Sequence, residues 1–363
     1  MPVCWITRAF VARRPTMIFT QSVIGRILGW LEARGIFSRI STFGGIGKMM
    51  EDHTMTRISK LLAACLLVFA MFLAPSVMNA FQQESVRQSM VVSTAWLQEH
   101  LKDPSLVILH VGTNRREYRD GHIAGARFLW TQALAYSDPD QTLELPPRTQ
   151  ADSVLKKLGI SEKSRIVLCF DGSNVTPTTR VFFTLDYLGL GDRVSLLDGG
   201  LDAWKAEGHP IVTETPAVTE GSFVPAQKAN LVVNCNWLMD NLDNSKISIV
   251  DARAAQYYSG GGGGMPRPGH IPNAVSIPFS TLLDSTNRLK DPASLRRIFQ
   301  QAGVKQGTRV ISYCHIGQQA TMVYFVAKYL GYEAQVYDGS FEEWSGRKDL
   351  PLVNPAASTP PRR

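Results

Sequence analysis

The sequence predicts an α/β protein made of two copies of one domain, each a mostly parallel sheet flanked by helices on both faces. Three sequence blocks recur in the same order at a spacing near 141 residues. Within each copy, short apolar runs alternate with helical patterns, which is typical of parallel strands joined by helices. A chain of 363 residues is long enough for two domains of ordinary size.

The repeat is clearest at the two ends of each copy. The stretch "VSTAWLQEHL" (92–101) returns as "VNCNWLMDNL" (233–242), and a D-G-x-x-x-x-W pattern closes the copies at Trp204 and Trp344. Between these ends, a G-H-I-x-x-A block also occurs in both copies. Three matched blocks in one order indicate a duplicated domain.

The recurring blocks set the domain boundaries. We expect a first domain at 88–213 and a second at 229–354. The segment 214–228 lacks periodicity and carries two prolines, so it is predicted to be a linker. The Pro-rich end, 355–363, is predicted to be a loose tail.

Residues 1–80 are predicted to be a leader that contains a secretory signal peptide, with its core at 55–80. A short basic segment, "MTRISK", precedes thirteen apolar residues (61–73) and a stretch that ends in small residues. This order is typical of export signals. Cleavage after Ala80 competes with cleavage after Ser76, and the start at Met1 or at Met55 stays open. We expect an exported protein, periplasmic or secreted.

The positive net charge of +7 does not indicate a nucleic-acid partner. Nearly all of it, +6, lies in residues 1–60, so the folded part is close to neutral. The thirteen-residue apolar run is shorter than the about 20 residues that span a membrane. We therefore expect no nucleic-acid binding and no stable membrane insertion of the mature chain.

Strands and helices alternate clearly in the second copy. Its predicted strands are 247–251, 275–279, 309–314 and 334–338, and its predicted helices are 237–242, 293–301 and 320–330. Parallel sheets of this kind bind ligands beyond the carboxyl ends of their strands.

Cys314 is the last residue of one such predicted strand. A helix beginning near Ala320 directs unpaired backbone N–H groups toward the loop His315–Gln319. If that loop curls, its own N–H groups form an anion-binding nest around the sulfur. A thiol in such surroundings ionises more readily, and the thiolate is a nucleophile. No cysteine spacing fits a zinc pair, so no metal site is expected.

The second copy resembles a rhodanese. The residues that carry this resemblance are D-A-R at Asp251–Arg253, the G-H-I-P-x-A block, the Cys314 corner and the closing D-G-x-x-x-x-W. The duplication is similar to the tandem-domain thiosulfate/3-mercaptopyruvate sulfurtransferases. The resemblance implies two rhodanese-like domains and a reaction that needs no cofactor.

In this family, the cysteine takes a sulfane sulfur from a small anionic donor, becomes a persulfide, and passes the sulfur to cyanide or to a thiol, for example of a thioredoxin-like partner. The resemblance assigns that role to Cys314 and implies a ping-pong cycle. It makes the following residues the active-site loop: His315, Ile316, Gly317, Gln318, Gln319 and Ala320.

The first copy departs from this pattern. Counted from the strand's arginine, Cys314 aligns with Phe170, and with one insertion it aligns with Asp171. An acid there resembles the inactive N-terminal domains of the family. We expect Cys169 and Cys235 to be structural and the first domain to be inactive.

The sequence gives a weaker signal for the donor-binding residues than for the reactive cysteine. The loop C-H-I-G-Q-Q matches neither the C-R-K-G nor the C-G-S-G version of the family, and Tyr257 stands where members carry an arginine. Arg267 matches a family arginine that holds the donor, although a solvated loop residue is an equal alternative. Asp251 either orients Arg253 and the loop N–H groups or caps a turn. We favour thiosulfate over 3-mercaptopyruvate because His315 could carry positive charge.

Two other functions are alternatives to sulfur transfer. Phosphatases with this fold need an arginine six residues after the cysteine, and Ala320 stands there instead. The remaining alternative is a binding module that carries sulfur or senses anions without turnover. The sequence does not indicate an oligomeric state.

Overall fold

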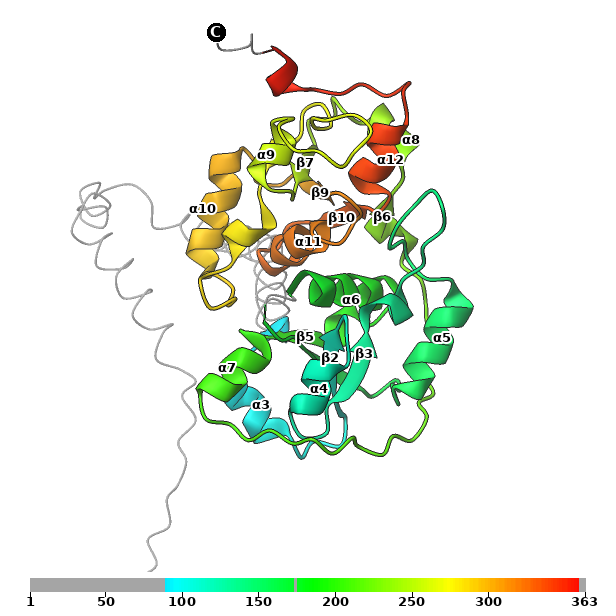
Figure 1. Cartoon of the computed structure of the whole chain (residues 1–363), viewed down its shortest axis with the longest axis vertical. Coiled ribbons are helices and arrows are strands. Elements are labelled where there is room, and N and C mark those ends of the chain that lie inside the picture. The colour runs from blue at the N-terminus through cyan, green and yellow to red at the C-terminus, as the bar shows by residue number, and fades with distance from the viewer. Residues whose placement is uncertain (1–88, 173–174, 359–363) are drawn as a thin grey trace, which may run out of the picture. The chain divides into compact units, whose positions relative to one another are not determined.

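The computed structural model describes residues 89–172 and 175–358, which form two α/β domains (Figure 1). The predicted leader and its signal peptide lie outside the described residues. Within those residues, no helix has the length and apolar character of a membrane span. Each domain is built on a five-stranded sheet in which every pair of neighbouring strands is parallel, as the sequence predicts.

The first domain has the strand order β1-β5-β4-β2-β3. Its strands are β1 (Val91–Val92), β2 (Leu106–Gly112), β3 (Arg127–Trp130), β4 (Arg165–Cys169) and β5 (Val194–Leu197). Its α-helices are α3 (Thr94–His100), α4 (Arg116–Asp120), α5 (Arg148–Lys157), α6 (Val175–Tyr187) and α7 (Gly200–Ala206), with 3-10 turns η1 (Thr131–Leu134) and η2 (Gly191–Arg193).

The second domain repeats this order as β6-β10-β9-β7-β8. Its strands are β6 (Val232–Val233), β7 (Ile247–Asp251), β8 (Val275–Ser276), β9 (Arg309–Tyr313) and β10 (Ala334–Tyr337). Its α-helices are α8 (Cys235–Asp240), α9 (Ala255–Tyr258), α10 (Pro292–Ala302), α11 (Ala320–Tyr329) and α12 (Ser340–Gly346), with 3-10 turns η3 (Ala229–Leu231), η4 (Phe279–Leu282) and η5 (Pro355–Ser358).

Strand β8 is shorter than the predicted strand at 275–279. It ends at Ser276, and η4 begins at Phe279. Pro278, which has no N–H for a ladder hydrogen bond, lies between them. The other three predicted strands of this domain match observed strands to within one residue.

Sheet register aligns the two copies residue by residue at the carboxyl ends of the strands. His110 of β2 lies opposite Cys169, and Asp251 of β7 lies opposite Tyr313. The residue after Tyr313 is Cys314, and the residue after Cys169 is Phe170. Phe170 therefore occupies the position of Cys314 in the first domain.

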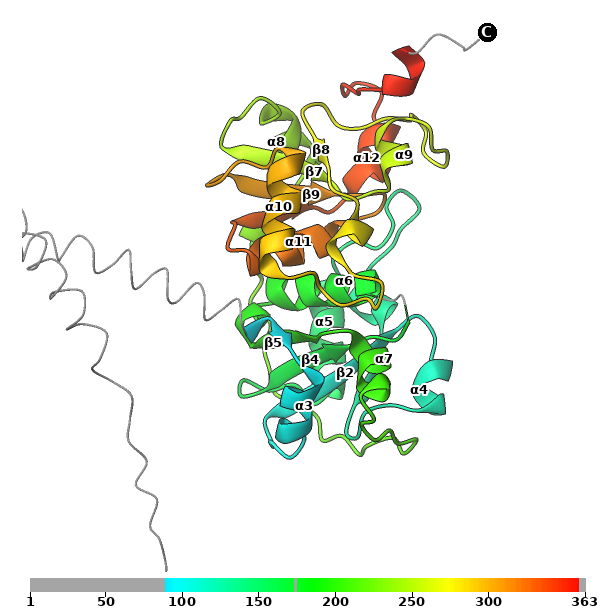
Figure 2. The same cartoon turned by 90° about the vertical axis from the view of Figure 1, so that its left-hand side faces the viewer.

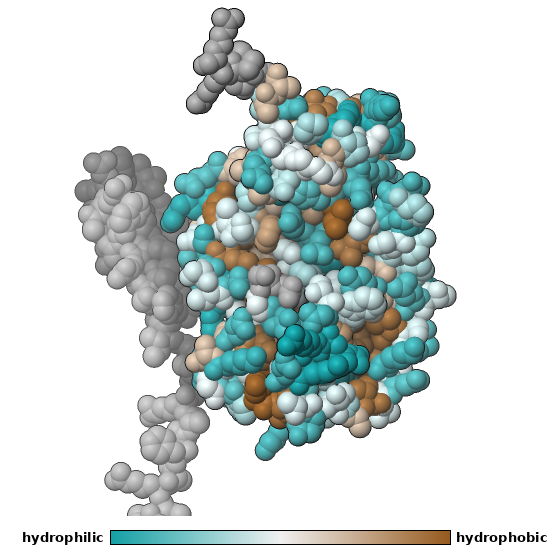
Figure 3. Space-filling model, viewed as in Figure 1, coloured by the Kyte–Doolittle hydropathy of each residue, from teal (hydrophilic) through white to brown (hydrophobic). Residues whose placement is uncertain are grey.

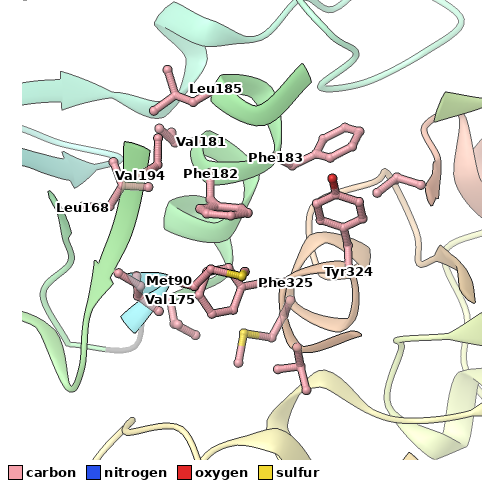
Figure 4. Packing of buried hydrophobic residues seen from close by; sticks show 14 of the residues in the cluster. Met90, Leu168, Val175, Val181, Phe182, Phe183, Leu185, Val194, Tyr324 and Phe325 are labelled. Carbon is pink, nitrogen blue, oxygen red and sulfur yellow. The ribbon is translucent and has the colours of Figure 1, made fainter. Parts of the chain in front are cut away.

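Helices α6 and α11 pack against each other between the two sheets (Figure 2). Phe182 and Phe325 meet edge to face with ring centroids 4.7 Å apart, and Phe183 meets Tyr324 in the same way at 5.0 Å (Figure 4). The Tyr324 hydroxyl donates to the buried Asp186 carboxylate at 2.7 Å. A single apolar core therefore runs through both domains.

The linker runs along the first domain without regular secondary structure up to residue 228. Backbone hydrogen bonds join Gly221 to Lys156, Phe223 to Ile160, and Ala226 to Leu188. Phe223 is buried in the shared core. At the other end of the chain, η5 occupies the first part of the segment that was expected to be loose.

Candidate active site

Cys314 lies directly after β9, at the carboxyl end of the sheet, and α11 begins six residues later at Ala320. We call residues 314–320 the Cys314 loop. The backbone of this loop curls so that the N–H groups of Ala320, Ile316 and Gln319 are directed toward the sulfur. Three converging N–H groups are suited to holding a sulfur anion.

Burial has the largest effect on the Cys314 thiol. The residue is only 1% exposed, and burial raises the pKa of its thiol. The N–H groups of Ala320, Ile316 and Gln319 lower that pKa, while the Asp251 carboxylate raises it again. The net pKa is above the ordinary value, so the N–H groups do not by themselves produce a thiolate at neutral pH, contrary to the expectation from the sequence.

Gly317 gives the Cys314 loop its turn. Its φ of +78° lies in the left-handed region that favours glycine. A Cβ at this position would lie 2.9 Å from the backbone oxygen of Asp338 and 3.0 Å from a guanidinium nitrogen of Arg180. Both the backbone conformation and the space therefore require glycine.

The two side chains behind Gly317 form a buried ion pair between the domains. Arg180 of α6 binds Asp338, which follows β10, through both nitrogens of its guanidinium fork. The backbone N–H of Leu145 also donates to Asp338 at 3.0 Å. Nearby, burial and the Asp338 charge raise the pKa of Glu144 to about 8, so Glu144 adds no second negative charge at pH 7.

The turn between β10 and α12 anchors the start of the Cys314 loop. The Cys314 N–H donates to the Ser340 hydroxyl at 3.2 Å, and the Phe341 N–H donates to the Cys314 carbonyl at 3.0 Å. The Glu342 N–H donates to the His315 carbonyl at 2.9 Å. Cys314 is thus held through both its N–H and its carbonyl group.

The other end of the Cys314 loop contacts the first domain. The Gln318 amide donates to the Thr176 hydroxyl at 3.2 Å, and the hydroxyls of Thr321 and Thr179 lie 2.9 Å apart. Thr176 and Thr179 belong to α6. The first domain therefore supports the loop although it carries no cysteine at the equivalent position.

Asp251 and Arg253 form a buried pair at the end of β7. The Arg253 side chain donates to both oxygens of Asp251, and its NH2 group also donates to the Gly269 carbonyl at 2.7 Å. Its guanidinium lies 3.9 Å from the centroid of the Phe341 ring. Burial alone would lower the pKa of Arg253, but the Asp251 carboxylate raises it. Asp251 therefore orients the Arg253 side chain, and it also caps the turn, because it accepts from the Arg253 backbone N–H at 3.0 Å.

His315 is not the cation that the sequence suggested. Burial and the neighbouring Arg253 charge lower the pKa of its imidazole below 6.5. Its ring meets the Tyr257 ring edge to face at 4.5 Å. At neutral pH the residue beside Cys314 is therefore a neutral imidazole, and the reason for favouring thiosulfate does not hold.

Arg267 is held by the end of α12 and the turn after it. Its guanidinium donates to the carbonyls of Ser345 at 3.0 Å, Leu350 at 2.9 Å, Trp344 at 2.9 Å and Arg347 at 2.5 Å. These four bonds favour an anchoring role over donor binding. Contact between Arg267 and the donor stays a prediction.

The first domain has a different pair at the corresponding place. His110 lies 3.0 Å from the carboxylate of Asp171, so an imidazole stands at the position of Asp251 and a carboxylate at the position of His315. Cys169 lies in a separate apolar cluster with Leu197 and Trp204, and burial raises the pKa of its thiol far above the ordinary range. Cys235 begins α8 in the core of the second domain. Both cysteines are buried where no loop N–H nest surrounds them.

Sequence reasoning missed Arg180, Asp338 and Ser340. Asp338 and Ser340 lie within the D-G-x-x-x-x-W pattern that marks the repeat, so that pattern was a usable signal. Arg180 lies 158 residues before Asp338 and matches no pattern. Among the described residues, no group of three or more His, Cys, Asp or Glu side chains could hold a metal ion.

The chain matches known proteins along both domains. Residues 93–207 and 234–347 match the Rhodanese-like domain family. The sulfur carrier protein TtuD of Thermus thermophilus is 31% identical, over 72% of this chain and 96% of the relative. The thiosulfate sulfurtransferase of Rattus norvegicus is 30% identical, over 71% and 92%. The 3-mercaptopyruvate sulfurtransferase of Escherichia coli is 30% identical, over 72% and 96%.

A solved structure of similar fold is the anaerobic ergothioneine biosynthesis enzyme from Chlorobium limicola in complex with trimethyl histidine. The match has a TM-score of 0.65 at 20% sequence identity and covers 73% of this chain and 70% of that one. At this identity the likeness extends to the fold alone.

The raised pKa of Cys314 predicts the pH dependence of its alkylation. Only the thiolate reacts with iodoacetamide, so the rate should be slow at pH 7 and rise about tenfold per pH unit through pH 8.5. The measurement is the alkylation rate at Cys314 in a Cys169→Ser/Cys235→Ser variant, followed by mass spectrometry. A plateau below pH 8 would contradict the prediction.

Replacement of Gly317 by Ala should disrupt the Cys314 loop. The left-handed conformation costs a residue with a Cβ about 1–2 kcal/mol, and the added carbon would press on Asp338 and Arg180. We expect a lower Tm and at least a tenfold slower reaction at Cys314. Gly346→Ala is the matched control, because its Cβ would meet nothing within 4 Å. Equal effects of the two substitutions would rule out the steric argument.

Proposed function

The chain belongs to the rhodanese family as a tandem-domain sulfurtransferase, and on that premise we propose that it moves a sulfane sulfur from thiosulfate or 3-mercaptopyruvate to cyanide or a thiol through a persulfide on Cys314. The observation that carries the proposal is the convergence of three backbone N–H groups on this one sulfur. In the first domain, Phe170 occupies the same position and has no thiol to offer.

The proposed reaction has two displacements at sulfur. With thiosulfate as donor, the Cys314 thiolate attacks the outer sulfur, the S–S bond of the donor breaks, and sulfite leaves with the electron pair. The loop N–H groups stabilise the resulting persulfide anion. Cyanide or a thiolate then attacks the terminal sulfur and leaves Cys314 as a thiolate again. No oxidant or cofactor enters the cycle.

Access to Cys314 requires an opening of the site, because the thiol is buried in this conformation. Tyr257, on the short helix α9, covers the neighbouring His315. The glycine-rich segment that follows packs on Tyr257, since a Cβ at Gly262 would lie 2.2 Å from its ring. We propose that α9 and this segment move aside to admit the donor.

The charges around the sulfur favour neither donor. Arg253 is paired with Asp251, His315 is neutral at pH 7, and Tyr257 stands where family members carry an arginine. None of these three described side chains therefore offers a free positive charge to thiosulfate or to the carboxylate of 3-mercaptopyruvate. Both donors therefore remain in the proposal.

A second candidate function is sulfur carriage without repeated turnover. It is favoured by the match to a relative named as a sulfur carrier protein. The buried thiol suits this role as well, because a persulfide inside the N–H nest would be shielded until a partner opens the site. In either role we propose that the protein acts after export; this rests on the sequence of residues 55–80 alone.

Substitution of Cys314 by Ser should abolish thiosulfate:cyanide sulfur transfer. Treatment of the parent protein with donor should add about 32 Da, one sulfur, to the peptide that contains Cys314. Cys169→Ser is the control and should retain both the adduct and the activity, because that thiol lies in a separate apolar cluster. Activity in the Cys314→Ser variant would refute the assignment.

Steady-state rates with thiosulfate and 3-mercaptopyruvate should separate the two candidate functions. A sulfurtransferase will form many equivalents of thiocyanate per chain when cyanide is in excess. A carrier will form one equivalent from preloaded persulfide and stop. High KM for both donors would indicate that a third sulfur donor is used.

A further inference from the structure

We propose that a cavity in the first domain binds a small organic anion, independently of the Cys314 site. The cavity has a volume of about 220 Å³ and lies between the start of β3, helix α4, the end of α5 and the linker. No residue of the Cys314 loop lines it. Binding in this cavity would depend on its own side chains and is independent of the proposed function.

One side of the cavity is a basic rim formed by Arg115, Arg119, Arg127 and Lys157. No acidic side chain is among the residues that line the cavity. In the part of the chain that the structure describes, no ion pair within 4.0 Å involves any of these four cations. By contrast, two cations adjacent to them in the sequence do form ion pairs: Arg116 pairs with Asp120, and Lys156 pairs with Asp152.

Among the residues of the basic rim, Arg127 gives the strongest evidence for a bound anion. It is half-buried, one nitrogen of its guanidinium donates to the Leu158 carbonyl, and its buried Nε has no hydrogen-bond partner. Burial lowers the pKa of this guanidinium. A half-buried charge without an anionic partner is costly, and a bound anion would offset that cost.

The rest of the lining is largely apolar, with Tyr118 and Thr215 as its polar members. Phe128 lies beneath the Arg115 guanidinium, which is 5.0 Å from its ring centroid, and Leu158, Pro216 and Val218 complete an apolar wall. Figure 3 shows a strongly hydrophilic patch in the region where Figure 1 places α4, next to apolar side chains. A ligand that fits both parts has an acidic head for the basic rim and a planar apolar body for the wall.

The size of the cavity limits the ligand. Pockets for drug-sized molecules span about 300–1,000 Å³. The volume of about 220 Å³ suits one ring with one acidic group. The predicted ligand class is therefore a single-ring aromatic carboxylate or phosphate ester.

The proposal is tested by calorimetric titration of phenyl phosphate into the full chain at constant ionic strength, which holds screening fixed. We expect one site per chain, with at least tenfold tighter binding of phenyl phosphate than of inorganic phosphate. The substitution pair Arg115→Gln/Arg119→Gln should weaken binding at least tenfold. Both residues are exposed, so the fold should be retained, as circular dichroism can check.

The matched control is Arg116→Gln/Lys156→Gln, which removes the same charge from neighbouring cations that do not line the cavity. It should bind phenyl phosphate within about twofold of the parent. Equal weakening by both pairs would mean general charge attraction and would overturn the proposal. Equal affinity for phosphate and phenyl phosphate would also overturn it. Binding should persist in Cys314→Ser, so failure of the proposed function would not affect this outcome.

Discussion

The buried ion pair between Arg180 and Asp338 is the contact on which the geometry of the site depends. It joins a helix of the first domain to the end of a strand in the second, directly behind Gly317. Gly317 can approach it closely only because it has no side chain, and that approach lets the backbone curl around Cys314. Removing one partner of a buried pair leaves an uncompensated charge, which is typically far more costly than losing an exposed pair. Both domains therefore determine the position of one sulfur atom.

At the carboxyl ends of equivalent strands, the two copies carry an acidic residue and a histidine in interchanged positions. The second domain has Asp251 at the end of β7 and His315 directly after Cys314, whereas the first has His110 on β2 and Asp171 directly after Phe170. In the first copy the imidazole and the carboxylate contact each other directly. In the second, Arg253 takes the carboxylate, and the imidazole faces Tyr257 instead. The carboxylate and the imidazole are thus interchanged between equivalent positions, while the two sheets keep the same strand order and only the second domain has a cysteine directly after the strand.

Much of the fold could be predicted from the sequence because its signals are local. Strand β9, Cys314 and α11 follow one another within 21 residues, so their patterns are visible in a short window. The charge state of His315 could not be predicted, since it depends on burial and on Arg253. Arg180 could not be assigned either, because its partner lies 158 residues away. Likewise, the carbonyls that hold Arg267 are brought to it only by the turn after α12.

Through the packing of α6 on α11, the first domain, which has no cysteine at the position of Cys314, stabilises the second domain. Phe325 and Tyr324 are fully buried only because Phe182 and Phe183 cover them. A truncated gene product that began at residue 229 would present this aromatic face to water, and large exposed apolar patches promote aggregation. The duplication therefore has a structural consequence: a chain without the first domain would lose the cover over these aromatic rings together with the contacts that Thr176 and Arg180 make behind the Cys314 loop.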